Sequence, residues 1–552
     1  MRSTIRRTST PGQMMRSGFV LAIAVACGAG NADCAQFVAY SGLDADRVVD
    51  LSERAPAFRE APWAALPWQE RSIPVASSGV ATDFTAIARQ GQALPPGESG
   101  NLGYMLLNPA TLDASGRGAF VSGVDGAERN QGIFLAGEHS LKVIAMGCGE
   151  GGGSGSQADC GDPSPIGGTF SGMFQGPLAA PAANDHGDVL FLADLVGAPS
   201  PRALFLYRFG DDSIVKIAAV GDPAPRGGTL LAIGAGVINN AGMIAFTART
   251  IEGQLAADSL LLWQDGVLST YLASGDPAPG GESFIFFGGE SREYLDGTWI
   301  PVSVPALNER NELAFKAHTE SGDGLYRSRN GLHEQLARWE DPEPGGGVFF
   351  DFRGDPVLNG RGEIAFMAYT AASAGAMPSA AGWFVGDGQP FRRALGDGDT
   401  LPQGEISSFA FSRNPFRPLD DAGNLALWAR YRLADTSERE VILLVRRDGT
   451  REVLVEQWTD SPLGGSWGVL NPWITSNNNA QIQFQAGTLE FAASTHGQFV
   501  ATYESASCLP AGSSRSRSHA AGNDLAHSPT SVRCARVSPS ETVMHRERRT
   551  QP

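Results

Sequence analysis

A short turn-and-strand pattern recurs seven times in this chain, and it constrains the fold more tightly than any other feature. The copies begin at residues 113, 184, 239, 308, 359, 420 and 477, as in NDHGDVLF, NNAGMIAF and NGRGEIAF. Asn or Asp at the first position caps a tight turn, and Gly at the fourth position supplies a positive φ. The residues after the turn alternate and end in Ala-Phe, which predicts a strand. The clearest copies assign structural turn roles to Asn184, Gly187, Asn239, Gly242, Asn359 and Gly362.

Two copies depart from this pattern at the glycine. Asn311 takes the glycine's place in the fourth copy, and asparagine is the next best residue for a left-handed backbone. Ala480 takes it in the seventh copy and does not suit that conformation, so we expect the seventh turn to be built differently.

Two further elements complete each repeat. An apolar hairpin, such as the run over 203–221, predicts two strands around a turn. A Gly- and Pro-rich stretch then follows, as in GDPAPRGG over 221–228, with similar stretches from residues 161, 275 and 340. Its recurrence predicts a bend needed in every repeat, not a single ligand-binding loop. With one strand after this bend and one after the Asn-x-x-Gly turn, each repeat supplies four strands.

Seven four-stranded units in tandem predict an all-β fold, a seven-bladed β-propeller. The first strand, from Asp83, lacks a hairpin partner, and so does the last, from His496. We therefore expect residues 83–89 to pair with 496–504 and close the ring, which would remove two free sheet edges. The alternative is an open β-repeat array, which gains nothing from these complementary ends.

The repeats over about residues 84–505 resemble the bacterial tandem-repeat proteins named for their N-x-x-G-x-x-A-F motif, the "choice-of-anchor" group. The resemblance rests on the copies at Asn184, Asn239 and Asn359. It implies an exported, surface-associated protein, and it implies no activity and no catalytic residues.

The two ends of the chain predict export and a flanking tail. Residues 1–34 have the layout of a signal peptide, with four arginines, an apolar run too short to span a bilayer, and small residues. Cys27 is an alternative site for a lipid anchor. Residues 35–82 are assigned as a connector, 83–505 as the propeller, and 506–552 as a disordered basic tail. The expected location is therefore secreted, periplasmic or at the cell surface, with no transmembrane helix.

Charge and cysteine content limit the possible ligands. The net charge is −17 although both ends are basic, so the part of the chain between them is strongly acidic. An acidic protein body repels phosphate backbones, which argues against nucleic-acid binding.

Cys148 and Cys160 flank a Gly-rich insert and are a candidate disulfide. Asp162, Asp222, Asp276 and Asp341 occupy equivalent bends and could bind Ca²⁺ as a ring, or each could hydrogen-bond its own backbone.

The sequence contains no H-E-x-x-H metal motif, P-loop or dinucleotide fingerprint, and the G-x-S-x-G match at residues 464–468 lies in a β-repeat where a nucleophile turn is not expected. The first functional hypothesis is therefore a non-catalytic binding or scaffold module for an extracellular protein or glycan. The alternative is a propeller enzyme acting on extracellular glycans or other polymers. Its candidate carboxylates are Glu290, Glu293 and Asp296, which cluster in an irregular insert.

Overall fold

The computed structural model describes residues 81–103, 111–148, 160–173, 180–253, 255–288, 291–293, 299–301, 303–412, 414–490 and 493–504. All of them belong to one compact unit, residues 76–552. The expected signal peptide, Cys27, the connector up to residue 80 and the basic tail lie outside the described residues. Over the described ranges, no helix is long and apolar enough to cross a membrane.

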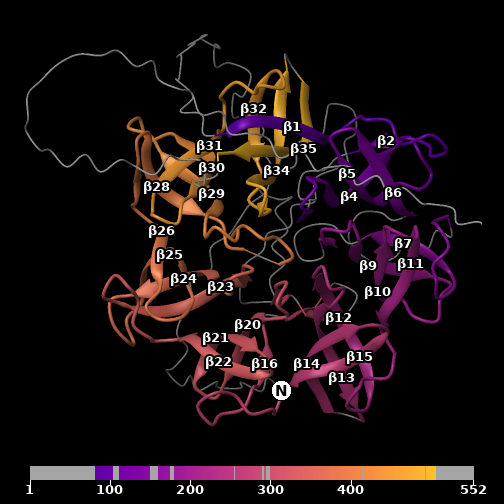
Figure 1. Ribbon diagram of the computed structural model, residues 1–552, viewed down its shortest axis with the longest axis horizontal. Helices are drawn as coiled ribbons and strands as arrows, with labels where there is room; N and C mark the ends of the chain where they lie inside the picture. The colour runs from indigo at the N-terminus through magenta and orange to yellow at the C-terminus, as the bar shows by residue number, and fades with distance from the viewer. Residues whose placement is uncertain are drawn as a thin grey trace, which may run out of the picture. The chain divides into compact units, whose positions relative to one another are not determined.

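Seven antiparallel sheets follow one another along the described chain and surround a common centre, as blades of a β-propeller (Figure 1). Blade 1 comprises β2 (Asn101–Leu102), β3 (Thr111–Leu112), β4 (Gly118–Asp125), β5 (Gln131–Gly137) and β6 (Ser140–Gly147). Blade 2 comprises β7 (Thr169–Met173), β8 (Ala182–Ala183), β9 (Val189–Val196), β10 (Arg202–Arg208) and β11 (Ser213–Ala219). Blade 3 comprises β12 (Thr229–Ile238), β13 (Ile244–Glu252), β14 (Leu255–Gln264) and β15 (Val267–Ala273).

Blades 4 to 6 repeat this order. Blade 4 comprises β16 (Phe286–Phe287), β19 (Ala306–Leu307), β20 (Leu313–Thr319), β21 (Gly322–Arg329) and β22 (Leu332–Arg338). Blade 5 comprises β23 (Val348–Leu358), β24 (Ile364–Ala371), β25 (Pro378–Gly386) and β26 (Arg392–Gly396). Blade 6 comprises β27 (Thr400–Leu401), β28 (Gly404–Phe409), β29 (Leu425–Arg432), β30 (Glu438–Val445) and β31 (Arg451–Glu456). The insert of blade 4 carries a separate pair, β17 (Ser291–Glu293) and β18 (Trp299–Pro301).

The seventh blade joins the two ends of the ring, as the sequence predicts. It comprises β32 (Ser466–Leu470), β33 (Thr475–Ser476), β34 (Gln481–Glu490), β35 (Ala493–Tyr503) and β1 (Ala81–Arg89). β1 pairs antiparallel with β35, in a register that runs from Ala81 opposite Tyr503 to Arg89 opposite Gly497. The closed propeller is therefore confirmed, and the open array is excluded.

The Ala-Phe pair of the repeat opens a strand and does not end one, which corrects the sequence-based expectation. In blade 3, Ala245 and Phe246 follow directly on Ile244, the first residue of β13. Side chains alternate along a strand, so neighbours face opposite sides of the blade. Phe246 packs in the core with Leu204 and Leu206 of blade 2, whereas Ala245 packs in the core with blade 4. The pair thus puts a large ring against one neighbouring blade and a small side chain against the other.

The same rule describes the interface between blades 4 and 5. Phe366 of β24 packs with Leu325 of blade 4, while Ala365 packs with Leu425 of blade 6. Phe366 also contacts Phe384 with ring centroids 5.6 Å apart, so each blade adds aromatic surface to a core shared with its neighbour. The blades are held together by these interleaved cores. The disulfide expected between Cys148 and Cys160 is present, with Cα atoms 5.8 Å apart.

Candidate functional site

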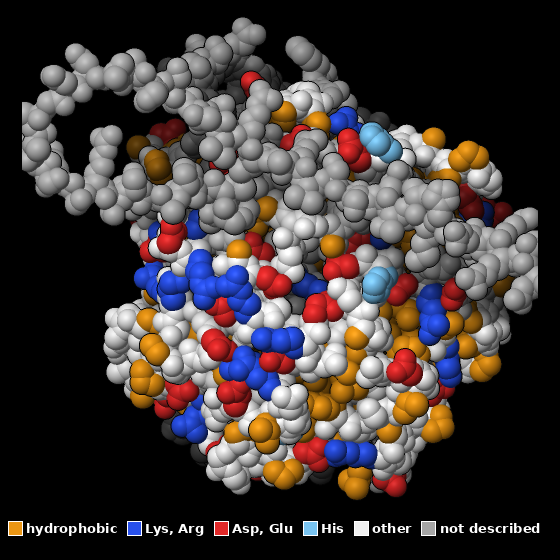
Figure 2. All heavy atoms as spheres, in the orientation of Figure 1, with side chains coloured by type: hydrophobic (Ala, Val, Ile, Leu, Met, Phe, Trp, Pro, Cys, Tyr) orange, Lys and Arg blue, Asp and Glu red, His pale blue; other side chains and the backbone are white. Residues whose placement is uncertain are grey.

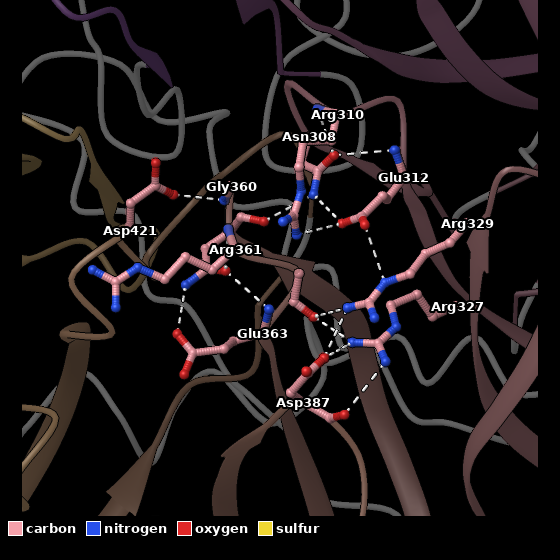
Figure 3. Close-up of polar contacts among 12 residues, drawn as sticks. Asn308, Arg310, Glu312, Arg327, Arg329, Gly360, Arg361, Glu363, Asp387 and Asp421 are labelled. Carbon is pink, nitrogen blue, oxygen red and sulfur yellow. Dashed lines mark hydrogen bonds and ion pairs between the residues drawn. The ribbon is translucent and has the colours of Figure 1, made fainter.

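The Asn-x-x-Gly turns form a closed ring of hydrogen bonds, which we call the turn belt. It contains the turns that begin at Asp113, Asn184, Asn239, Asn308, Asn359, Asp420 and Asn477. Asn359 shows the local geometry. Its side-chain oxygen accepts the N–H groups of Arg361 at 3.0 Å and Glu363 at 2.9 Å, and its amide donates to the Asp420 carbonyl of the next blade at 3.0 Å. The first residue therefore caps its own turn and ties it to the next, as Asn308 also does (Figure 3).

Such bonds join every blade to the next. The asparagine amides of residues 184, 239, 308, 359 and 477 each donate to the carbonyl of the equivalent residue in the following blade. The side chains of Asp113 and Asp420 have no amide group to donate. There, the backbone N–H of the next residue donates to a side-chain oxygen of the following turn, from Ala114 to Asp185 at 2.8 Å and from Asp421 to Asn478 at 3.0 Å. Hydrogen bonds of the belt therefore join neighbouring blades around the whole ring.

Positive φ angles occur at the fourth position of the turns. Gly187, Gly242 and Gly362 have φ of 86°, 76° and 84°, and Asn311 has φ of 59°. Ala480 has φ of 56°, so the seventh turn follows the others despite its alanine. The expectation that it is built differently is therefore wrong.

The first and fifth residues of these turns are chemically matched. In two turns whose first residue is an asparagine, the fifth residue is a carboxylate that accepts from the asparagine amide: Asn184–Asp188 at 3.1 Å and Asn308–Glu312 at 2.7 Å. Where the first residue is an aspartate, the fifth is a donor, as in Asp420–Asn424 at 2.8 Å. Asp113 likewise accepts from the residue-117 arginine at 2.7 Å. Each turn thus avoids a pair of facing carboxylates.

The four aspartates considered for calcium lie in separate bends and cap strands. Asp162, Asp222, Asp276 and Asp341 each accept a backbone N–H of the preceding outer strand, at 2.8 to 2.9 Å. The first three also form ion pairs, with residues 129, 216 and 226 respectively. Among the residues that the structure describes, no group of three or more His, Cys, Asp or Glu side chains could hold a metal ion. The arrangement favours the backbone-capping role.

We expect Asp276→Asn to lower the free energy of unfolding by about 1 kcal/mol, because it weakens two charge-assisted hydrogen bonds. Burial raises the pKa of Asp276, but hydrogen bonds from Arg226 and the Ala273 amide outweigh it and hold that pKa below its ordinary value. Urea unfolding with and without CaCl₂ checks this. A calcium-dependent stabilisation that Asp276→Asn abolishes would instead support the calcium ring.

An insert of blade 6 crosses the centre of the ring. Asn414 donates from its amide to the carbonyls of Val304 and Pro356 at 2.9 and 3.0 Å, and from its backbone to Asp355 at 3.2 Å. Arg417 donates to the Ile238 carbonyl of blade 3 at 2.9 Å. Asn414 and Asp355 are both 2% exposed. This part of the centre is therefore filled by protein, with polar groups paired to protein groups.

A narrow hollow with aromatic walls lies beside this insert. Phe416 stacks on Trp473 with ring centroids 5.9 Å apart, and Trp383, Phe411 and Trp428 complete the wall. Trp383 donates its indole N–H to the Ala410 carbonyl at 2.9 Å. The hollow follows from packing the insert against blades 6 and 7.

Three arginines come from the segments that meet near Glu363, next to the turn belt; we call Arg361, Arg392 and Arg447 the arginine cluster. Arg361 lies in the same turn as Glu363, Arg392 opens β26, and Arg447 lies in the turn between β30 and β31. Arg447 donates to Glu363 at 2.8 Å, and Figure 3 shows no contact from the Arg361 guanidinium to the other residues drawn. Lys and Arg side chains also gather over β24 to β26 in the space-filling view (Figure 2).

Burial lowers the pKa of the Arg392 guanidinium, and Arg447 and Arg451 add to this effect, while Glu363 and Asp448 oppose it. The chain folds this way because the hairpin turn of blade 6 reaches the Asn-x-x-Gly turn of blade 5. No sequence motif signals the cluster, since its members come from three separate segments.

A close Ser–His contact in the described part of the chain is not an exposed nucleophile. Ser328 Oγ lies 2.5 Å from His333 Nδ1, but Ser328 is 1% exposed and cannot reach a substrate. Of the carboxylates considered for an enzyme, Glu290 and Asp296 fall outside the described residues, and the side chain of Glu293 is not described.

We expect the protein to lose stability as pH falls from 7 to 5.5. Burial lowers the pKa of His333 and His496, with Asp276 opposing the shift at His333. The unfolded chain, whose histidines have pKa near 6.5, then binds more protons than the folded chain. The contribution of the two partly buried neutral histidines to the free energy of unfolding is therefore fully present above the unfolded-state pKa, and it is lost as the pH falls below that pKa. Thermal unfolding midpoints across this range check the sign, and His333→Asn should reduce the slope.

The chain matches the family described as "Family of unknown function (DUF7453)" over residues 159–295 and 261–508. A search of curated proteins found no match. Among solved structures, the polysaccharide lyase Uly1 is 9% identical to this chain, with a TM-score of 0.35. The match covers 77% of this chain and 100% of the lyase chain. A Trypanosoma rangeli sialidase is 10% identical, with TM-score 0.31 and coverage of 66% and 58%. An Aleuria aurantia lectin is 9% identical, with TM-score 0.25 and coverage of 64% and 96%.

These structural likenesses are too distant to carry an argument about function. The likeness to the N-x-x-G-x-x-A-F group stays a resemblance of the repeats, since the family match does not test it. That match spans most of the propeller and more than half of the chain, so this protein belongs to the family of unknown function DUF7453.

Proposed function

We propose that this protein is a non-catalytic binding or scaffold module, exported to the periplasm or the cell surface, whose partner is an extracellular protein or glycan. The signal-like residues 1–34 and the resemblance to surface-associated repeat proteins support export. Membership of the N-x-x-G-x-x-A-F group is part of the same proposal.

The part of the ring's centre that the insert of blade 6 fills is the observation that carries this function. Asn414 and Asp355 are buried there and bond to neighbouring protein groups, so they hold the insert in place. The turn belt fixes the blades around it. Such a body offers a rigid outer surface, and rigid surfaces bind without a large ordering cost.

One pair of residues favours the enzyme alternative. His318 Nδ1 lies 2.8 Å from Asp323 Oδ1, and both side chains are about one third exposed. The His318 ring stacks on Phe286 at a centroid distance of 4.7 Å, beside the insert of blade 4. An oriented, accessible imidazole is a possible general base for polymer cleavage.

A combined binding and turnover screen tests the two functions. The mature, exported protein is applied to glycan and extracellular-protein arrays, and the same polymers are assayed for released fragments. We expect retention without fragment release. Fragment release that is lost in His318→Ala, with the fold intact by circular dichroism, would establish the enzyme and overturn the proposal.

A further inference from the structure

The arginine cluster concentrates positive charge on an otherwise acidic protein. The whole chain carries −17, yet Arg447 pairs with Glu363, Arg361 lies in the same turn as Glu363, and Arg392 lies within electrostatic range of Glu363, Arg447 and Asp448. Glu363 is 14% exposed and already receives the Asn359 amide at 3.0 Å as well as Arg447 at 2.8 Å. Glu363 is therefore already engaged by Arg447 and Asn359, and it leaves the Arg361 and Arg392 guanidinium groups without a hydrogen bond to it.

Two of these guanidinium groups have no acceptor among the described residues. The side chains of Arg361 and Arg392 form no hydrogen bond or ion pair there, whereas nearby Arg451 is tied to Asp399 at 2.6 Å. Arg392 is partly buried, and removing a cation from water without a partner is unfavourable. Its repulsion by Arg447 and Arg451 adds to that cost. An anion placed between these groups would offset both effects.

The geometry suits a planar or tetrahedral anion. A guanidinium presents a rigid fork of N–H donors that matches a carboxylate or a sulfate. Arg361 and Arg447 are on exposed turns, so a polymer can approach from solvent. We infer that the arginine cluster of Arg361, Arg392 and Arg447 binds the acidic groups of an anionic polysaccharide. The inference rests on the proposed binding function and names its ligand class.

Binding of four polymers by the full chain tests the inference. Polygalacturonate supplies carboxylates, dextran sulfate supplies sulfates, dextran is the neutral control, and duplex DNA represents the nucleic-acid class. Calorimetry in 50 and 200 mM NaCl should show binding of at least one acidic polysaccharide that weakens with salt, and no binding of dextran. The carboxylate and sulfate arms identify which acidic group is recognised.

Four variants locate the site. Arg392→Gln should weaken binding about tenfold, equivalent to about 1.4 kcal/mol, and the triple Gln variant of the cluster should abolish it. Arg208→Gln removes an exposed arginine of blade 2 and should change affinity less than twofold. Glu363→Gln should strengthen binding, because it removes the competing negative charge and keeps an oxygen for Asn359. Circular dichroism confirms that each variant is folded.

Several outcomes overturn the inference. Equal affinity in the wild type and the triple variant would do so, as would failure of both acidic polysaccharides to bind. Binding of DNA alone, lost in the triple variant, would assign the cluster to nucleic acids instead. Retention of only neutral glycans on the arrays would remove this ligand class yet leave the binding module intact. Polymer cleavage would overturn the module even if the arginines are needed for affinity.

Discussion

A chain that lacks β1, residues 81–89, is expected to lose the cooperative unfolding of the closed ring. β1 supplies the outer strand of the seventh blade, and its Ile87 and Ala88 are 3% and 1% exposed. Loss of Ile87 packing alone is worth about 2–5 kcal/mol, against a typical total stability of about 5–15 kcal/mol. The deletion would also expose β35 as a free edge, which promotes association. Size-exclusion chromatography and urea unfolding measure both effects.

Two controls separate ring closure from a general loss of core. Ile87→Ala retains the strand pairing and should lower the free energy of unfolding by about 2–5 kcal/mol while keeping one cooperative transition. A synthetic peptide with the sequence of residues 81–89 should bind the deleted protein and restore part of its stability, because an added strand can complete an open sheet edge. A deleted protein that stays monomeric and unfolds like the wild type would contradict the role of β1.

The ring closure was predictable because each end of the repeat region keeps one strand of a hairpin whose other strand is missing there. Turn chemistry is local: an Asn or Asp at the first position and a Gly at the fourth specify the bend regardless of the rest of the chain. The same locality led to the errors. The sequence marks Ala-Phe but does not show which side of a blade each residue faces, and it gives no sign that tertiary contacts hold Ala480 at a positive φ.

The centre of the ring and the arginine cluster depend on contacts that no local pattern encodes. Arg417 reaches a carbonyl 179 residues away, and Arg447 pairs with a glutamate 84 residues away. Both follow from the angle at which the blades meet. Histidine and carboxylate content likewise gave no sign of the pair His318–Asp323, because those residues become neighbours only across the β20–β21 hairpin.

The matched first and fifth residues of the belt turns allow a sharp test with isosteric changes. Asn184 is 2% exposed, and its amide lies 3.1 Å from an Asp188 oxygen whose partner oxygen accepts the Phe209 amide. Asn184→Asp places two carboxylates in this contact, so the folded state must either hold two repelling charges or keep one carboxyl group protonated. We expect the free energy of unfolding at pH 7 to fall by about 2–3 kcal/mol, the upper range for leaving a buried polar group unpaired.

The double variant Asn184→Asp with Asp188→Asn should recover most of this loss, because it reproduces the arrangement of Asp420 and Asn424 in blade 6. The penalty in the single variant should also shrink as pH falls from 7 to 5, since protonation of one of the two carboxylates removes the repulsion. Urea unfolding of the wild type, both single variants and the double variant gives the coupling energy directly. Additive effects would show that the pairing of donor and acceptor does not stabilise the belt. A coupling of about 2 kcal/mol would explain why an aspartate at the first position occurs only with a donor at the fifth.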